Sequence, residues 1–438
     1  MRNLICKPLA ALVFLVLFAI PAPAMEIEEV TSPGGIRAWL VEDKTIPLIA
    51  MQFSFKGGSA LDPQGKDGVT HFLTGMMDEG AGDLDSAAFQ KKRDELAFKM
   101  SFDDSLDYFE GNFQTLSRNR DQSFALLKLA VTSPRFDAEP LERVRRQFVV
   151  SAGDDDENPD KIASRAWMTA ALGNHPYARD VNGSEKTLAA VTAADLAAAH
   201  QRIFVKKTLQ IAVVGNIDAA TLSRLLDDTF GGLPEGVEPE LPAMVKSVAG
   251  PSLKVIDRDI PQSIIVFGHA GILRSDPDFI PAYIMSEILG GGSFGSRLTA
   301  EIREKRGLTY GVGMGLVPLD RAGLFMGSLG TRNEKAGEAL ALVKEVMKHM
   351  AEEGPTAQEL DEAKTYFTGS YALRFDSDAK IASQLLGIQQ QNLGIDYISR
   401  RNAMVAAVTL EQVKAQAKRL LDPDRLIVTV VGRPQGLN

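Results

Sequence analysis

The sequence predicts an α+β fold made of two homologous halves joined by a linker. The main observation is an internal repeat, since VTAADLAAAHQRIFVKKTLQIAVVG at 191–215 aligns without a gap with VTLEQVKAQAKRLLDPDRLIVTVVG at 408–432. Each copy begins with a threonine suited to cap a helix, continues through a polar turn and ends in a β-branched strand. The copies lie about half of the 438 residues apart, which indicates a domain duplication rather than a solenoid.

Other landmarks recur in the same order in each half. An Ile-Pro pair precedes a strand-like run at 46–55 and again at 260–269, and long helical patterns follow in the middle of each half. Strands and helices do not alternate regularly, which favours α+β halves. The stretch FGGLPEGVEPELPAMVKSVAGPS (230–252) is rich in Pro, Gly and Glu and has no apolar period. We interpret it as the linker between domains at 25–229 and 253–438.

Residues 1–24 have the pattern of a secretory signal peptide. Arg2 and Lys7 accompany the apolar stretch PLAALVFLVLFAI, and small residues end at Ala24, where cleavage is expected. An uncleaved anchor is the alternative, but the stretch is shorter than the roughly 20 residues that a spanning helix needs. The only cysteine, Cys6, precedes this stretch, so neither a disulfide nor a lipid anchor is expected. We expect a periplasmic protein with no stable membrane association, if the source is a Gram-negative bacterium.

The charge balance excludes one class of partner. The chain has a formal net charge of -9 and no run of Lys or Arg beyond short pairs. Nucleic-acid binding is therefore not expected, because it requires a basic footprint.

One stretch of the first half has the length of a zinc-peptidase motif but lacks most of its chemical residues. In H-x-x-E-H, two histidines hold the metal and the glutamate deprotonates its bound water. In GVTHFLTGMMDEGAG (68–82) these positions are His71, Thr74 and Gly75, so a threonine replaces the base and a glycine replaces the second ligand. One imidazole cannot make this site. On chemistry alone, His71 is a single helical histidine beside an apolar run.

A segment of the second half carries a more specific pattern. ILGGGSFGSRLTAEIREKRGLTYGVG (288–313) resembles the C-terminal-half motif of the pitrilysin (insulinase) family of zinc peptidases, in which a Gly-rich turn leads to a helix and then to Gly-Leu-x-Tyr. The stretch at 68–82 resembles the family's zinc motif in position and flanks. Together the two resemblances cover essentially the whole mature chain. They imply two α/β-sandwich halves that form half of a clamshell chamber.

The resemblance assigns roles to individual residues. Arg303 and Tyr310 match the family's Arg/Tyr pair, which binds the substrate backbone and stabilises the tetrahedral intermediate. The alternative is a surface arginine and a half-buried tyrosine, and Arg306 is expected to be an ordinary solvated charge. The family's third zinc ligand, a distal glutamate, falls near Ser151, while Glu142 is expected on a solvated helix face. These replacements imply that the N-terminal half has lost catalysis as a unit and binds no metal.

Two further patterns are weak. Gly290, Gly292 and Gly295 satisfy G-x-G-x-x-G, but they follow a helical pattern rather than a strand, so no dinucleotide site is expected. The acidic run Asp154–Glu157 lacks the spaced ligands of an EF-hand and is predicted to be a solvated loop.

The resemblance implies a zinc-free, non-catalytic subunit of a heterodimeric periplasmic metallopeptidase that degrades peptides. Its partner would be a homologous subunit with zinc and an intact H-x-x-E-H, and unfolded peptides would be the substrates. The first alternative is a peptide-binding or scaffold protein without a catalytic partner, similar to family members in respiratory complexes. The second is a hydrolase that uses other residues. It is disfavoured because no ligand spacing is found at the remaining histidines, His175, His200, His269 and His349.

Overall fold

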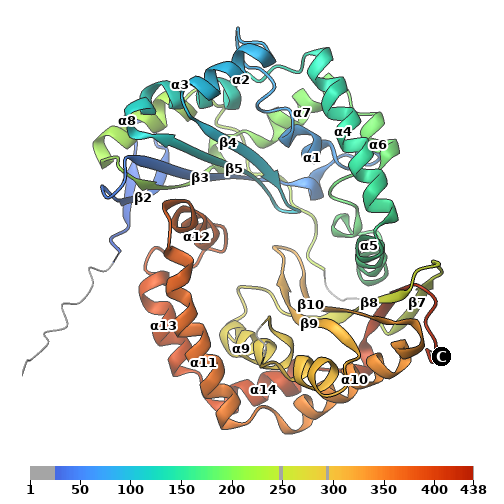
Figure 1. Ribbon diagram of the computed structural model, residues 1–438. Coiled ribbons are helices and arrows are strands. Elements are labelled where there is room, and N and C mark those ends of the chain that lie inside the picture. The colour runs from blue at the N-terminus through green and yellow to red at the C-terminus, as the bar shows by residue number, and fades with distance from the viewer. Residues whose placement is uncertain (1–24, 246–249, 293–294, 438) are drawn as a thin grey trace, which may run out of the picture.

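The computed structural model describes residues 25–245, 250–292 and 295–437. The predicted signal peptide, 1–24, lies outside the described residues. The rest of the chain forms two halves, each with one β-sheet covered by helices (Figure 1).

The two sheets have matching strand orders. The N-terminal sheet has the order β1-β2-β6-β3-β5-β4, and the C-terminal sheet has the order β7-β11-β8-β10-β9. In both, the last strand of the half lies inside the sheet, parallel to one neighbour and antiparallel to the other. The strands are β1 Glu28–Thr31, β2 Arg37–Glu42, β3 Leu48–Lys56, β4 Lys99–Asp104, β5 Tyr108–Leu116, β6 Gln210–Gly215, β7 Ser252–Ile256, β8 Gln262–Ala270, β9 Thr309–Pro318, β10 Gly323–Arg332 and β11 Ile427–Val431.

The helices fall into an N-terminal and a C-terminal set. The first set is α1 Val69–Thr74, α2 Ser86–Glu95, α3 Arg120–Thr132, α4 Ala138–Glu157, α5 Pro159–Leu172, α6 Glu185–Ala189, α7 Ala193–Ile203 and α8 Ala219–Phe230. The second set is α9 Phe279–Gly290, α10 Ala336–Glu353, α11 Ala357–Tyr371, α12 Asp378–Gln390, α13 Tyr397–Ala407 and α14 Leu410–Leu420. The segment from 230 to 252 that the sequence predicts as a linker runs from the end of α8 to the start of β7.

The internal repeat is confirmed down to its helix caps. The first copy folds as α7 and β6, and the second as α14 and β11. Thr192 accepts a hydrogen bond from the backbone N–H of Asp195, and Thr409 accepts one from that of Gln412, so both helices begin with a capping box. The two halves therefore share the same capped helix and following strand, as well as the same strand order.

One helix of each half packs on the sheet of the other half. Helix α5 packs on β8 and β11 of the C-terminal half, and α12 packs on β3 and β6 of the N-terminal half. Figure 1 shows α12 between the N-terminal sheet and helices α11 and α13. Trp167 of α5 is fully buried, and its Nε1–H donates to the carbonyl of Ile427 at 2.9 Å. On the other side, Ile381 and Leu385 of α12 bury against Val214. These contacts bury apolar surface between the halves, so more than the linker holds them together.

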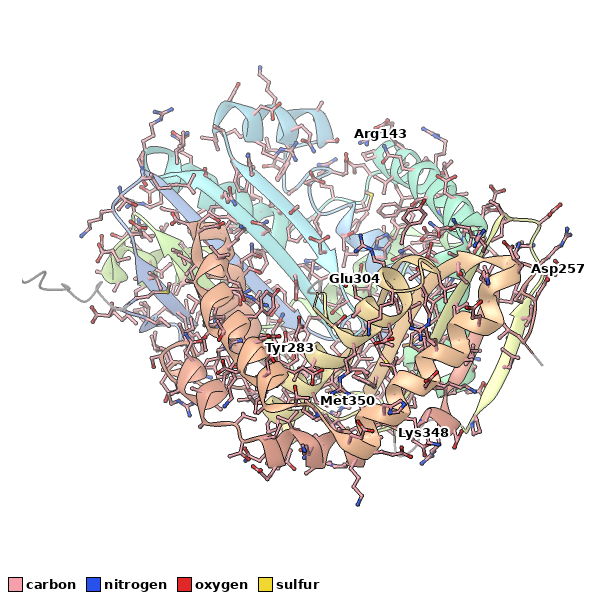
Figure 2. All side chains as sticks on the ribbon, turned by 60° about the horizontal axis from the view of Figure 1, so that its bottom comes forward. Arg143, Asp257, Tyr283, Glu304, Lys348 and Met350 are labelled. Atoms are coloured by element: carbon pink, nitrogen blue, oxygen red, sulfur yellow. The ribbon has the colours of Figure 1, made fainter. Side chains whose placement is uncertain are left out.

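Helix α10 at the surface is amphipathic. Figure 2 labels two residues of α10, of which Met350 is buried and Lys348 is exposed. Helix α10 thus covers the C-terminal core with one face only. Among the residues that the structure describes, no helix combines the length and the apolar character needed to cross a membrane.

The acidic run Asp154–Glu157 does not form the predicted loop. It is the last turn of α4, and Asn158 after it caps α5 by accepting from two backbone N–H groups. Arg165 of α5 forms an ion pair with Asp156 at 2.7 Å. This pair offsets part of the unfavourable interaction between carboxylates and a helix C-terminus.

Candidate functional site

The turn before α1 is held by a buried carboxylate. Asp62 accepts hydrogen bonds from the backbone N–H of Gly68 at 3.0 Å and from the hydroxyl of Thr70 at 2.5 Å, and Arg202 lies 3.3 Å away. Burial raises the pKa of Asp62 to about 6, although Thr70 and Arg202 partly oppose that rise. Asp62 therefore fixes the start of α1, the helix that carries the degenerate zinc motif.

His71 projects from this helix into contacts that hold its ring. Its Nδ1 forms a hydrogen bond with Oδ1 of Asp104 on the edge strand β4, at 2.9 Å. Its imidazole stacks on the ring of Phe148 from α4, with centroids 4.7 Å apart and 28° between the planes. Phe148 also packs edge-on against Phe72 at 5.6 Å. The imidazole is thus fixed between a carboxylate and an aromatic ring.

The other two motif positions do not fit a metal. The hydroxyl of Thr74 donates to the carbonyl of His71 at 2.7 Å, so the position of the general base serves the helix backbone. A Cβ atom at Gly75 would lie 2.8 Å from Cζ of Phe148 and 3.1 Å from Cγ1 of Val144. Even a methyl group forces a shift there, so an imidazole would fit only if the side chains of Phe148 and Val144 moved away. A zinc ion does not fit this motif.

The distal ligand position is equally unsuited. Ser151 is exposed on α4, one turn after Phe148. Glu142 pairs at the surface with Arg145 at 3.2 Å, as expected for a solvated face. Within the described ranges, no three or more His, Cys, Asp or Glu side chains gather in a way that could hold a metal ion.

Arg303 lies on a short helical segment, and Tyr310 lies on the strand that follows it. Arg303 is exposed on a π-helical segment, Thr299–Glu304, rather than on an ordinary α-helix, and π-helices are often found at functional sites. Its last residue, Glu304, is labelled in Figure 2. Tyr310 is at the start of β9 and is 88% exposed, not half-buried as a purely structural tyrosine would be. Arg306 pairs with Glu301 at 2.7 Å and is partly solvated, as expected.

The remaining histidines have other partners. His200 bonds to the carbonyl of Val131, and burial lowers the pKa of His200. Carbonyls also bond to His175 and His269, and His349 lies beside Glu353 at the surface. The described structure thus brings none of these histidines to another, and the independent-hydrolase alternative gains no support. The glycine pattern at 290–295 follows helix α9, as the sequence predicts, and not a strand.

Sequence reasoning missed Phe148. The signal was present, because an aromatic residue occurs one turn before the position of the distal ligand. Its contact with His71, however, joins two helices far apart in the chain. It becomes visible only in the folded protein.

Comparison with known proteins gives matches over both halves. The family model described as insulinase (peptidase family M16) matches residues 38–185, and the model described as the peptidase M16 inactive domain matches residues 190–367. The boundary between the models precedes β6, which belongs to the N-terminal sheet. The models therefore divide the chain earlier than the two sheets do.

Relatives and solved structures agree with these models. The crystal structure of a peptidase M16 inactive domain from Pseudomonas fluorescens is 31% identical, with a TM-score of 0.86 over 94% of this chain and 98% of that one. A non-peptidase homolog of Helicobacter pylori, YmxG, is 26% identical over 84% of this chain and 85% of its own. A chain of complex III from Candida albicans shares the fold, with a TM-score of 0.77 at 13% identity over 94% of this chain and 97% of its own. The chain belongs to the M16 (insulinase) peptidase family and is a member of its inactive type.

Proposed function

We propose that the protein is the zinc-free, non-catalytic subunit of a heterodimeric M16 peptidase. One observation carries the proposal. Phe148 fills the space beside His71 where a second zinc ligand would lie, whereas Arg303 and Tyr310 of the other half remain at the surface. A chain that has lost the metal site and kept this pair has parts suited to complete another subunit's site.

The chemistry of the pair suits that role. A guanidinium such as that of Arg303 offers charge-assisted hydrogen bonds to a peptide carbonyl. The phenol of Tyr310 can donate to an oxyanion that develops at the scissile carbonyl. Its hydroxyl makes no hydrogen bond within the described part of the chain and is therefore available to a substrate. The partner would supply the zinc, the base and the activated water.

Two further elements belong to the proposal. The pattern at 1–24 would direct the protein to the periplasm. The inner faces of both subunits would enclose a chamber, which admits unfolded peptides and excludes folded domains by size. The substrates would accordingly be peptides in extended conformation.

The test is peptide hydrolysis by the mature chain, alone and mixed with a homologous subunit that carries an intact H-x-x-E-H. The zinc content of each protein is measured by mass spectrometry, and their association by analytical ultracentrifugation. Arg303→Ala and Tyr310→Phe are compared with two matched controls. Arg306→Ala changes a neighbouring arginine paired with Glu301, and Tyr366→Phe changes a tyrosine that is 48% exposed.

We expect activity only in the mixture, with a loss of about 10²-fold or more in kcat for each variant of the pair and little change for the controls. Activity that does not respond to Arg303→Ala or Tyr310→Phe would remove the active-site role. A stable complex without any activity would favour the scaffold alternative, which the shared fold with a complex III chain makes physically reasonable.

A further inference from the structure

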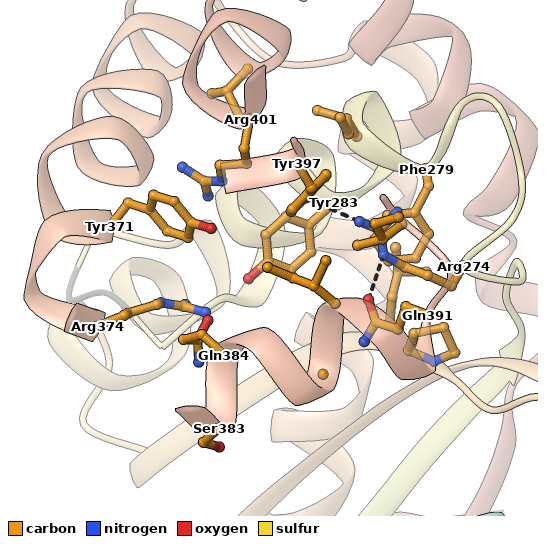
Figure 3. A pocket seen from close by; sticks show the side chains of 17 residues that line it. Arg274, Phe279, Tyr283, Tyr371, Arg374, Ser383, Gln384, Gln391, Tyr397 and Arg401 are labelled. Atoms are coloured by element: carbon orange, nitrogen blue, oxygen red, sulfur yellow. Dashed lines mark hydrogen bonds between the residues drawn. The ribbon is translucent and has the colours of Figure 1, made fainter. Parts of the chain in front are cut away.

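The C-terminal half contains a pocket that the proposed function does not use. It has a volume of about 340 Å³ and lies between helices α9, α12 and α13 (Figure 3). This volume is in the range of small-molecule sites. Neither the zinc-motif residues nor Arg303 and Tyr310 line it.

The charge of the pocket is one-sided. Its lining includes three arginines, Arg274, Arg374 and Arg401, and no aspartate or glutamate. None of the three forms an ion pair with a carboxylate of the described chain. The neighbouring Arg400, which does not line the pocket, pairs with Asp396 at 2.6 Å. The protein as a whole has a net charge of -9, whereas this cavity has three arginines and no carboxylate in its lining. Such a cavity is suited to hold an anion.

Arg401 is the most buried of the three, with 7% of its surface exposed. Its Nη1 donates to the carbonyl of Phe367 at 2.7 Å and to Oδ1 of Asn402 at 3.0 Å, and its guanidinium lies over the ring of Tyr371 at 4.3 Å. These partners are all neutral. Burial lowers the pKa of Arg401, since the charged form loses hydration. Toward the residues that the structure describes, Arg401 donates hydrogen bonds only from Nη1, so the N–H groups on Nε and Nη2 can donate to an acceptor in the pocket.

Arg274 faces the pocket from another direction. Nε donates to Oε1 of Gln391 at 2.9 Å, and Nη2 donates to the hydroxyl of Tyr397 at 3.0 Å. Its guanidinium also stacks on the ring of Phe279 at 4.3 Å. Figure 3 shows Arg274 on one side of the pocket and Arg374 with Arg401 on the other. Neutral groups thus orient the cation without neutralising it.

The rest of the lining is largely apolar. Aromatic rings of Phe279, Tyr283 and Tyr371 contribute to the walls, together with aliphatic residues such as Leu316 and Ile388. Rings and aliphatic side chains favour an apolar body, while guanidinium groups favour carboxylate or phosphate oxygens. The occupant that satisfies both parts is amphipathic.

We propose that this pocket binds an oxyanion, a carboxylate or a phosphate, carried on a small apolar body. Two sources of a carboxylate would satisfy it, a free aromatic acid or the C-terminus of a peptide. The proposal does not depend on the catalytic partner, because all lining residues belong to this chain.

Isothermal titration calorimetry of the mature chain tests it. The probes are phenyl phosphate, N-acetylphenylalanine, its uncharged amide, and a short peptide ending in phenylalanine with a free or an amidated C-terminus. The variants are Arg401→Gln, Arg274→Gln and Tyr397→Phe, each checked for folding by circular dichroism. Arg400→Gln on the same helix is the matched control.

We expect at least one anionic probe to bind and the amides to bind at least about tenfold more weakly. Arg274→Gln and Arg401→Gln should each weaken binding about tenfold or more, and Arg400→Gln should not. If Arg401→Gln does not fold, the less buried Arg274 still decides the outcome. A preference for the free peptide over N-acetylphenylalanine would identify a peptide C-terminus as the source. Equal binding of the charged and uncharged probes, no binding of any anion at millimolar concentration, or unchanged affinity in Arg274→Gln would overturn the proposal.

Discussion

The imidazole of His71 and the ring of Phe148 are stacked, with centroids 4.7 Å apart and planes 28° from parallel. Together with the edge-on contact between Phe148 and Phe72, this stack connects the motif helix α1 to α4, the helix that contains the position of the third zinc ligand. The ring of Phe148 also lies beside Gly75, the position that a second histidine ligand has in H-x-x-E-H. Two positions of the degenerate motif, His71 and Gly75, are therefore packed against one aromatic ring.

Gly75→Ala is expected to destabilise the protein because its methyl group would lie 2.8 Å from Cζ of Phe148. The backbone of Gly75 is in the right-handed helical region, so conformation does not oppose alanine. Overpacking of this kind costs about 1 to 3 kcal/mol in the free energy of unfolding. Urea denaturation of the variant measures the change.

Phe148→Leu in the same background completes a double-mutant cycle. Removing the ring atoms should recover part of the loss, with a coupling energy of about 0.5 to 3 kcal/mol. Gly369→Ala is the matched control, since Gly369 lies inside α11 and a Cβ atom there meets nothing within 4 Å. That control should be neutral or stabilising by up to about 1 kcal/mol. Additive effects of Gly75→Ala and Phe148→Leu would contradict the steric explanation.

Asp62 should make the protein less stable as the pH rises from about 4 to about 6. Its pKa is raised to about 6 in the folded protein, above its ordinary value of 3.8, so over this range the folded form holds more protons than the unfolded form. The contribution is fully present below about pH 4 and is lost through about pH 6, amounting to roughly 3 kcal/mol.

Asp62→Asn tests this, because an amide does not titrate. The free energy of unfolding is measured from pH 4 to 7 for both proteins. The difference between the wild type and the variant should change over that range in favour of the variant as the pH rises. In the variant, Arg202 loses its ion-pair partner. This shifts the variant's free energy of unfolding by a constant amount at every pH and leaves its slope between pH 4 and 6 unchanged. Parallel curves would exclude Asp62 as the titrating group.

The sequence contains enough local information to predict the repeat and the degenerate motif. The threonine caps at Thr192 and Thr409 and the β-branched strands after them depend on neighbours in sequence, so a gap-free alignment identifies them. Tertiary contacts are different. The apolar face of α5 or α12 does not reveal which sheet the helix covers. The sequence predicts that each helix packs within its own half, whereas each packs on the sheet of the other half. The stack of Phe148 on His71 and the pocket around Arg401 depend in the same way on residues distant in the chain.

Trp167→Ala is expected to cost about 3 to 5 kcal/mol in the free energy of unfolding. The indole is fully buried between α5 and the C-terminal sheet, and its N–H bonds to the carbonyl of Ile427. Trp167→Phe should cost less, because it keeps most of the apolar contact and loses the hydrogen bond. Trp39→Phe changes a partly buried tryptophan at the other contact between the halves, beside α12, and guanidinium denaturation followed by circular dichroism compares the two contacts. Equal losses in Trp39→Phe and Trp167→Ala would argue against a special role of α5 in holding the halves together.

Tyr310→Phe should leave the free energy of unfolding within about 0.5 kcal/mol of the wild type, as expected for an exposed side chain. Tyr177→Phe offers the opposite case within the same protein. The buried hydroxyl of Tyr177 donates to Asp107 and accepts from the backbone N–H of Arg321 at 3.1 Å. Removing it leaves a buried carboxylate without that donor, at a cost of about 1 to 3 kcal/mol. Thermal and urea denaturation of both variants measure the contrast. Destabilisation by Tyr310→Phe as large as that by Tyr177→Phe would mean that a loss of activity in the mixture reflects folding, so the exposed tyrosine would no longer report on a partner's active site.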